Sequence, residues 1–137
     1  METLKTLLND EDVRGAVRCA DGSLCLFRKK GVADLFQLLH DNPGALRGAV
    51  VCDRVVGCGA AWLMIKGQIR EVFASLMSQP AYKLLRRYGI ITSCDQLAPA
   101  ILNHAGNDTC PVEKLTAEAN APDTAYELID GFINNKN

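Results

Sequence analysis

The chain has 137 residues and a mass of 14.9 kDa, which is the length of one ordinary domain. Hydrophobic residues make up 48% and charged residues 23%, a balance that excludes a disordered or low-complexity chain. Fifteen basic against sixteen acidic residues give a net charge of -1, without the basic excess expected of a nucleic-acid-binding surface.

Membrane insertion and secretion are also disfavoured. The longest apolar run, residues 55–65, is about half of the roughly 20 residues that a membrane-spanning helix needs. The N-terminus brings in acidic residues early and lacks the shape of a signal peptide. We therefore expect a single cytoplasmic domain over residues 1–137, with neither nucleic acid nor membrane as a partner.

The six cysteines do not form a recognisable redox or metal motif. No C-x-x-C spacing occurs among them, and a chain with this much apolar sequence needs no disulfide framework. We expect most of the thiols to be reduced and buried as small hydrophobic groups. They are Cys19, Cys25, Cys52, Cys58, Cys94 and Cys110.

The first third of the chain predicts a helix, a hairpin and a second helix. Apolar residues at helical spacing indicate an amphipathic helix over residues 3–9. Residues 16–19 and 24–27 read as strands joined at Asp21-Gly22, a tight-turn dipeptide. A helix over residues 32–40 is ended by Asn42-Pro43-Gly44.

The centre of the chain alternates strands and helices. Continuous apolar residues 49–52 predict a buried strand, and residues 58–66 predict a helix that is apolar nearly all round and belongs against a sheet. A strand over 71–76, a helix over 81–88 opened by Ser78-Gln79-Pro80, and a strand over 90–93 after Gly89 follow.

The last third is predicted to be helical. Helices are expected over residues 96–103, from residue 110 and from residue 122. The full order of elements predicts an α/β fold, a three-layer α/β/α sandwich with one mixed sheet. That sheet should be antiparallel at the hairpin and parallel in the later units.

Four short sequence patterns in this chain are similar to patterns of a known protein family. They are Asp53-x-x-Val56-Gly57-x-x-Ala60-Ala61, Ser78-x-Pro80-Ala81, Tyr88-Gly89-Ile90, and Asn103-x-x-Gly106 followed by Cys110-Pro111-x-Glu113. Together they resemble a small prokaryotic family of unknown function, the DUF1893 type, a zinc-less offshoot of the cytidine deaminase-like superfamily. The resemblance extends from the hairpin to the last helix and implies a cytidine deaminase-like fold.

The resemblance does not carry deaminase activity. A working deaminase needs a His or Cys ligand and a Glu at the start of one helix, and P-C-x-x-C at the start of the next. Cys58 could stand for one ligand, but the expected Glu is Ala60, and the two cysteines of the second motif are Ala81 and Leu84. We expect no bound zinc and no other cofactor.

Cys110 and Glu113 are the candidate catalytic residues. If a helix begins at Cys110, its thiol lies at the positive end of the helix dipole, which lowers a thiol pKa. A cysteine-dependent enzyme or a redox protein is then one hypothesis, with Glu113, Asp53 or His104 handling protons. The structural alternative is a capping box, in which Glu113 folds back to the amide of the cap residue.

The candidate ligand-binding residues flank the predicted carboxyl edge of the sheet. Asp53 follows a predicted strand, and Gly57 and Cys58 form a glycine turn whose amides could hold an anion. Their alternative is structural, a turn cap and close helix–sheet packing. Ser78 is either a helix cap or faces the same pocket. Asn103 and Gly106 complete this set.

Three functional classes remain open. The first is a protein that binds a nucleotide-like or other small anionic ligand between the Asp53–Cys58 turn and the Asn103–Glu113 loop. The second is the cysteine-dependent enzyme, and the third is a non-catalytic regulatory interaction module. A homodimer is also predicted, because symmetric dimers are the commonest oligomers. Lys83, Arg86 and Arg87 are interpreted as solvated surface.

Overall fold

The fold is built on a mixed sheet. The computed structural model describes residues 1–29, 32–101 and 111–134. In this part of the chain the sheet has five strands in the order β2-β1-β3-β4-β5. They are β1 (Gly15–Arg18), β2 (Leu24–Phe27), β3 (Val50–Val56), β4 (Glu71–Ser78) and β5 (Ile91–Ala98). β1 runs antiparallel to β2 and β3, whereas β3, β4 and β5 are parallel, as the sequence predicts.

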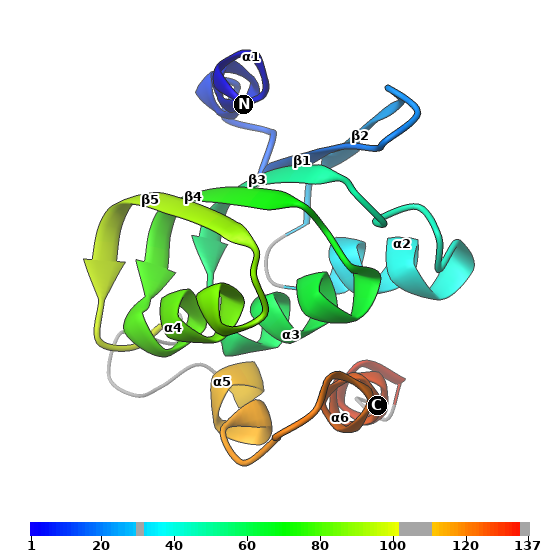
Figure 1. Ribbon diagram of the computed structural model, residues 1–137, viewed down its shortest axis with the longest axis vertical. Helices are drawn as coiled ribbons and strands as arrows, with labels where there is room; N and C mark the ends of the chain where they lie inside the picture. Colours follow the sequence, from blue (N-terminus) through cyan, green and yellow to red (C-terminus); the bar gives the residue numbers. More distant parts are fainter. Residues whose placement is uncertain (30–31, 102–110, 135–137) are drawn as a thin grey trace.

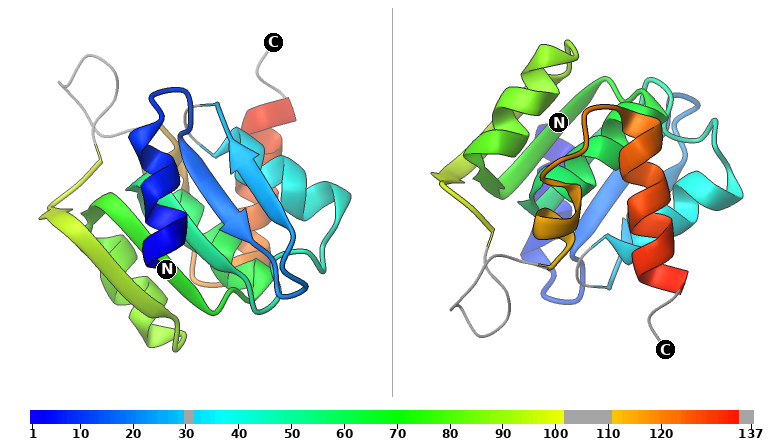
Figure 2. Two further views of the ribbon diagram at one scale, coloured as in Figure 1. Left: turned by 90° about the horizontal axis from the view of Figure 1, so that it is seen from above. Right: turned by 90° about the horizontal axis from the view of Figure 1, so that it is seen from below.

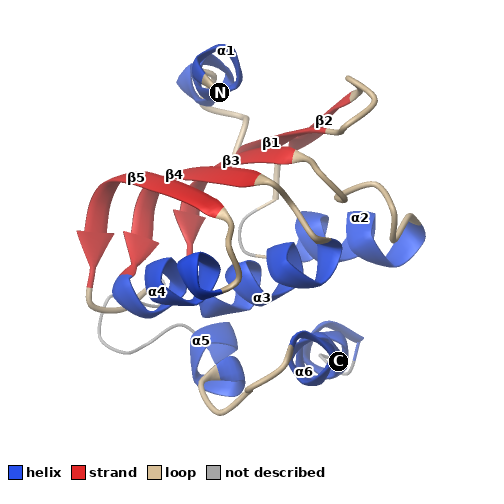
Figure 3. Ribbon diagram, viewed as in Figure 1, coloured by secondary structure: helices blue, strands red, loops and turns tan. Residues whose placement is uncertain are grey.

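Helices cover both faces of the sheet. α1 (Glu2–Lys5) and the short 3-10 helix η1 (Thr6–Asn9) lie on one face, and α2 (Ala33–Asp41), α3 (Cys58–Gly67) and α4 (Gln79–Arg87) lie on the other (Figure 1 and Figure 3). α5 (Pro111–Thr116) and α6 (Pro122–Asn134) pack on the far side of α3 from the sheet (Figure 2). The predicted α/β fold, with helices on both sides of a mixed sheet, is confirmed.

α3 is the central helix of the molecule. The sheet covers one of its sides, and α5 and α6 cover the other (Figure 1). Most of its side chains are buried, including Trp62, Leu63 and Met64. This position explains why its sequence is apolar nearly all round, because such a helix has no face left for solvent.

A smaller apolar cluster joins the N-terminal helix to the sheet. Leu4 packs with Ala16, Val50, Cys52 and Phe73. The guanidinium of Arg54 also reaches this side, where it donates hydrogen bonds to the backbone oxygens of Val13, Leu8 and Asp10 at 2.8–2.9 Å. The segment between η1 and β1 is therefore tied to β3 through one side chain.

Turn positions follow the sequence prediction. Gly22 has φ 91° in the β1–β2 hairpin, and the carboxylate of Asp21 accepts hydrogen bonds from the backbone N–H and the hydroxyl of Ser23. Gly89 has φ 78° and follows Tyr88, the residue after α4. Both are left-handed conformations that glycine adopts without a steric cost.

The predicted ends of the three parallel strands are too early, by four residues at β3, two at β4 and five at β5. The strand predicted to end at residue 52 continues to Val56, because it pairs with β4 as far as Met77. The helix predicted from residue 96 does not form there, because residues 96–98 pair with the end of β4. Residues 102 and 103 of that predicted helix lie outside the described residues. No helix in the described ranges is both long and apolar enough to cross a membrane.

Candidate functional site

The parallel strands bring two helix starts to one edge of the sheet. α3 begins one residue after β3, and α4 begins directly after β4. In open α/β sheets this carboxyl edge is where ligands bind. Ser78 caps α4, because its hydroxyl accepts a hydrogen bond from the N–H of Ala81 at 3.2 Å. The predicted capping role of Ser78 is therefore confirmed.

Glu113 fills the amino end of α3. Its Oε1 accepts a hydrogen bond from the N–H of Cys58 at 2.7 Å, and its Oε2 accepts one from the N–H of Gly59 at 2.9 Å. A carboxylate is the group that a helix N-terminus favours, through its free N–H groups and its positive dipole end. The anion that the Gly57–Cys58 turn was expected to attract is thus supplied by the chain's own α5.

The two glycines of this turn make room for α5. A Cβ atom at Gly57 would overlap the carboxylate of Glu113, and one at Gly59 would overlap the Cγ1 of Val112. Glycine at both positions lets the backbone of α3 approach α5 closely. The close packing expected here was between helix and sheet, whereas the element that these glycines let come close is α5.

Cys58 is a poor nucleophile in this setting. Burial and the neighbouring Glu113 carboxylate raise the pKa of its thiol to about 11, while a hydrogen bond with Ser78 acts in the opposite direction. The thiol is therefore protonated at neutral pH, and the thiolate is the reactive form of cysteine. None of the five described cysteines forms a disulfide.

Asp53 lies inside β3 and not at its end. It pairs with Gly15 of β1 and with Ala74 of β4, and its Oδ1 accepts a hydrogen bond from the N–H of Arg54 at 2.8 Å. Burial raises the pKa of its carboxyl to about 7, although two backbone N–H groups, Arg14 and Arg54 oppose that rise. The prediction that Asp53 follows the strand is wrong, because β3 extends beyond it.

A groove runs along the carboxyl edge beside the α3 start. It has a volume of about 500 Å³ and lies between α3, α4 and the segment from α5 to α6. The chain that follows each parallel strand contributes to it, with Cys58 after β3, Gln79 and Pro80 after β4, and Pro99 after β5. Of the described ligand-binding candidates, Cys58 lines this groove.

Two cations on α4 face the groove. Lys83 and Arg87 are four residues apart, one helical turn, and both line it. Neither makes a salt bridge or a side-chain hydrogen bond with another described residue. The described lining holds no acidic residue and adds apolar surface from Trp62 and Leu84. The groove is therefore electropositive on one side and apolar beneath.

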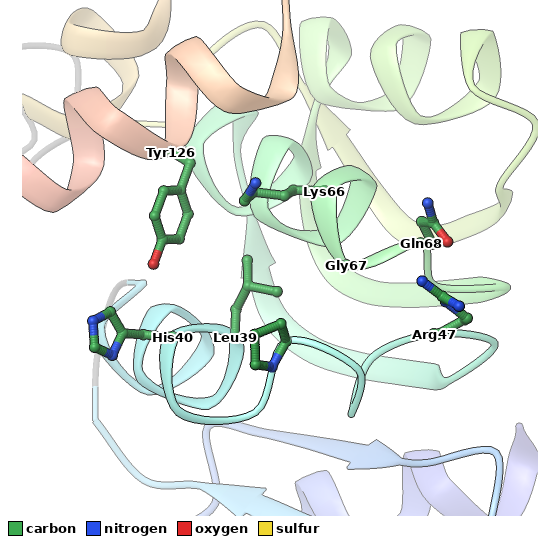
Figure 4. A pocket seen from close by; sticks show the side chains of 8 residues that line it. Leu39, His40, Arg47, Lys66, Gly67, Gln68 and Tyr126 are labelled. Carbon is green, nitrogen blue, oxygen red and sulfur yellow. The ribbon is translucent and has the colours of Figure 1, made fainter.

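A second cavity lies at the opposite end of α3. It has a volume of about 310 Å³, opens to solvent and is bordered by α2, the loop after it, the end of α3, and α6 (Figure 4). Its polar lining consists of His40, Arg47, Lys66, Gln68 and Tyr126. It shares no lining residue with the groove at the carboxyl edge.

Apolar residues occupy the two positions at which a deaminase of the resembled superfamily would carry zinc ligands. Ala81 and Leu84, which stand where the resemblance places two zinc ligands, are buried in the core. No group of three His, Cys, Asp or Glu side chains in the described ranges has a metal-binding arrangement. Asn103, His104, Gly106 and Cys110 lie outside the described residues.

Sequence reasoning missed the basic side of the groove. Lys83 and Arg87 were interpreted as solvated surface, and their (i, i+4) spacing was the available signal that both lie on one face of a helix. Arg47, Gln68 and Tyr126 had no such signal, because they come from three separate segments that only the tertiary fold brings together.

Comparison with known proteins identifies the family. No curated protein matches the chain. A structure titled the crystal structure of a DUF1893 family protein (TM1506) from Thermotoga maritima is similar, with a TM-score of 0.85 and 25% sequence identity, covering 95% of this chain and 87% of that one. The family model described as TM1506, domain of unknown function (DUF1893), matches residues 3–133. Because that match spans nearly the entire sequence, the chain belongs to the DUF1893 family.

Proposed function

We propose that this protein binds a small anionic molecule in the groove at the carboxyl edge of the sheet. The observation that carries the proposal is the pair Lys83 and Arg87, two cations that line a groove of about 500 Å³ without an acidic partner among the described residues. Unpaired cations of this kind complement a phosphate or a carboxylate.

The rest of the lining suits an organic ligand. Pockets for small molecules usually measure roughly 300–1,000 Å³ and combine apolar walls with a few polar groups. Trp62, Leu84 and Pro80 are the apolar wall, and the side chains of Gln79 and Asn120 offer amides. The resemblance to the deaminase superfamily favours nucleotide-like members of this class.

The described residues do not favour covalent chemistry in the groove. The pKa of Cys58, raised to about 11 by burial and by Glu113, keeps its thiol protonated. Both carboxylate oxygens of Glu113 accept hydrogen bonds from the α3 amides. Binding, without a reaction at these two side chains, is therefore the function that the geometry supports best.

Ligand-dependent thermal stability tests the proposal. The probes are the four common nucleoside 5′-monophosphates, ribose 5-phosphate and inorganic phosphate, each titrated into the full chain. Ligand that binds only the folded state raises the unfolding temperature. We expect at least one organic phosphate to raise it, and the variant Lys83→Gln/Arg87→Gln to weaken that binding about tenfold or more.

The control removes the same charge elsewhere. Arg28→Gln/Lys29→Gln changes two exposed cations next to β2 and should bind like the wild type. If no probe stabilises the wild-type chain, or if both double variants bind equally well, the groove is not an anion site and the proposal fails.

A further inference from the structure

We infer that the cavity at the carboxyl end of α3 is a second ligand site, one that takes a small organic carboxylate. It is separate from the groove proposed above, because the two lie at opposite ends of α3 and have no lining residue in common. The inference depends on the charge of the cavity, on the backbone of Gln68 and on the apolar walls.

Polar side chains from four segments line this cavity. His40 comes from the end of α2, Arg47 from the loop that follows, Gln68 from the residue after α3, and Tyr126 from α6. Figure 4 shows the hydroxyl of Tyr126 directed toward the His40 ring, and the Arg47 and Gln68 side chains next to each other. Arg47 and Gln68 therefore lie at one end of the cavity, and Leu39 and Lys66 separate them from His40 and Tyr126 (Figure 4).

Arg47 is the cation left available for a ligand. The Lys66 ammonium donates a hydrogen bond to Asp123 at 2.6 Å and lies 5.0 Å from the centre of the Tyr126 ring. His40 lies 3.4 Å from the carboxylate of Asp41. The guanidinium of Arg47 has no hydrogen bond or ion pair with any other described residue.

A single unpaired guanidinium, that of Arg47, indicates a ligand with one negative charge. The planar guanidinium matches a carboxylate with two parallel hydrogen bonds. The carboxyl ends of α2 and α3 also border the cavity, and their negative dipole ends repel anions in proportion to charge, a dianion about twice as strongly as a monoanion. A carboxylate therefore fits this cavity better than a phosphate dianion does.

The backbone at Gln68 supplies independent support. Gln68 has φ 64° and ψ 46°, the left-handed conformation, and no other described non-glycine residue has a positive φ. Glycine is favoured at this position after a helix, so a side chain here has a steric cost. Strained residues of this type cluster at ligand sites. The left-handed conformation also ends α3, where the Gln68 N–H donates a hydrogen bond to the backbone oxygen of Ile65 at 3.0 Å, and Gln68 lines the cavity.

The size of the cavity limits the ligand. A volume of about 310 Å³ is at the lower end of the range for small-molecule pockets, which begins at roughly 300 Å³. Leu39, Pro43 and the Tyr126 ring form apolar walls. We therefore assign the site to a carboxylate with a compact apolar body, about the size of a single ring.

Benzoate and its uncharged isostere benzamide form a matched probe pair. Each is titrated into the 15N-labelled full chain while the backbone and side-chain amide signals of Gln68 are followed. We expect benzoate to shift these signals saturably and benzamide to leave them unchanged at the same concentrations. Arg47→Gln should weaken benzoate binding about tenfold or more.

Gln68→Gly separates a ligand role from a structural one. Glycine relieves the left-handed strain, so this variant should unfold at a temperature higher by about 2 °C. Its affinity for benzoate should also fall about tenfold, because the cavity loses a hydrogen-bond donor. In this variant the backbone amide signal of Ile69 reports the binding. A purely structural glutamine predicts the gain in stability without the loss of affinity.

Arg28→Gln is the charge-matched control, at the opposite end of α2 from the cavity. It should bind benzoate like the wild type. The inference is overturned if benzamide shifts the signals as benzoate does, if Arg28→Gln weakens binding as much as Arg47→Gln, or if Gln68→Gly binds benzoate unchanged. Failure here leaves the groove intact, because the phosphate probes are measured separately.

Discussion

Asp53 illustrates how one buried side chain makes stability depend on pH. Its carboxyl lies within β3, where burial raises its pKa from 3.8 to about 7. Between these two values the folded chain keeps a proton that the unfolded chain releases. The free energy of unfolding therefore falls as the pH rises through this window.

We predict that Asp53→Asn removes this pH dependence. The shift of the pKa from 3.8 to about 7 corresponds to roughly 4 kcal/mol at most, lost by the wild type between about pH 4 and pH 7. Asparagine stays neutral and can still accept the Arg54 N–H. The variant should be more stable than the wild type at pH 8, with little difference at pH 4, as measured by urea unfolding.

Asp95→Asn is the control for this measurement, since Asp95 is exposed on β5. Its unfolding profile should follow the wild type. An unchanged slope between pH 4 and pH 7 in Asp53→Asn would show that Asp53 does not hold a proton in the folded chain.

The structural role of a single residue could be predicted from the sequence where that role depends only on neighbouring residues. The cap at Ser78 and the turns at Gly22 and Gly89 depend on neighbours within three residues, so the sequence pattern was sufficient. Asp53 was misplaced because the end of a strand is set by pairing with another strand. That pairing involves Ala74 and Leu76, about twenty residues further along the chain.

α5 depends on one carboxylate for its position. It has six residues, too few to be stable as an isolated helix, and its contact with α3 is made by Glu113 and Val112. Thr116, buried at its end, donates a hydrogen bond to the Val112 backbone oxygen at 2.9 Å. Because α5 also borders the proposed groove, the contact with α3 sets the shape of that groove.

Glu113→Gln should weaken this contact. An amide group accepts only one of the two N–H hydrogen bonds well and carries no charge for the helix dipole. We expect a loss of about 2 kcal/mol in the free energy of unfolding, measured by chemical denaturation. The matched control is Glu118→Gln, an exposed residue after α5, which should change stability little. Equal stability of the two variants would contradict the assigned role of Glu113.

The errors in element assignment have one cause. Residues 96–98 carry helix-compatible side chains, but pairing with β4 holds them in β5. Local propensity is a weak preference that tertiary hydrogen bonding overrides. α3, in contrast, was predicted correctly to be buried, because its composition leaves no polar face in any arrangement.

β5 forms one outer edge of the sheet and carries exposed apolar side chains. β5 has eight residues and no neighbouring strand on its outer side, among the strands described. Ile91 is 58% exposed and Leu97 44% exposed on this strand, and Tyr88 lies just before it. Long edge strands with apolar side chains readily pair with another chain. Leu84 and Leu85 of α4 are buried and hence not available for such a contact.

We therefore predict a homodimer in which β5 contributes to the interface. Native mass spectrometry should give twice the chain mass, without bound zinc. Ile91→Lys should shift the population to monomer, because it places a charge on the edge strand. Leu24→Lys, on the short β2 at the opposite edge, is the control and should remain dimeric. A monomeric wild type, or dissociation only by Leu24→Lys, would contradict this arrangement.

The amino-acid pattern was enough for the class of fold, the order of most elements and the burial of α3. These features follow from hydrophobic periodicity and turn residues, which act over a few neighbouring positions. The partner of Glu113, the length of β3 and β5, and both cavities depend on contacts between residues that are about 20 to 90 positions apart. Such contacts form only when the sheet and helices pack together, and local preferences contain no information about which distant groups then meet.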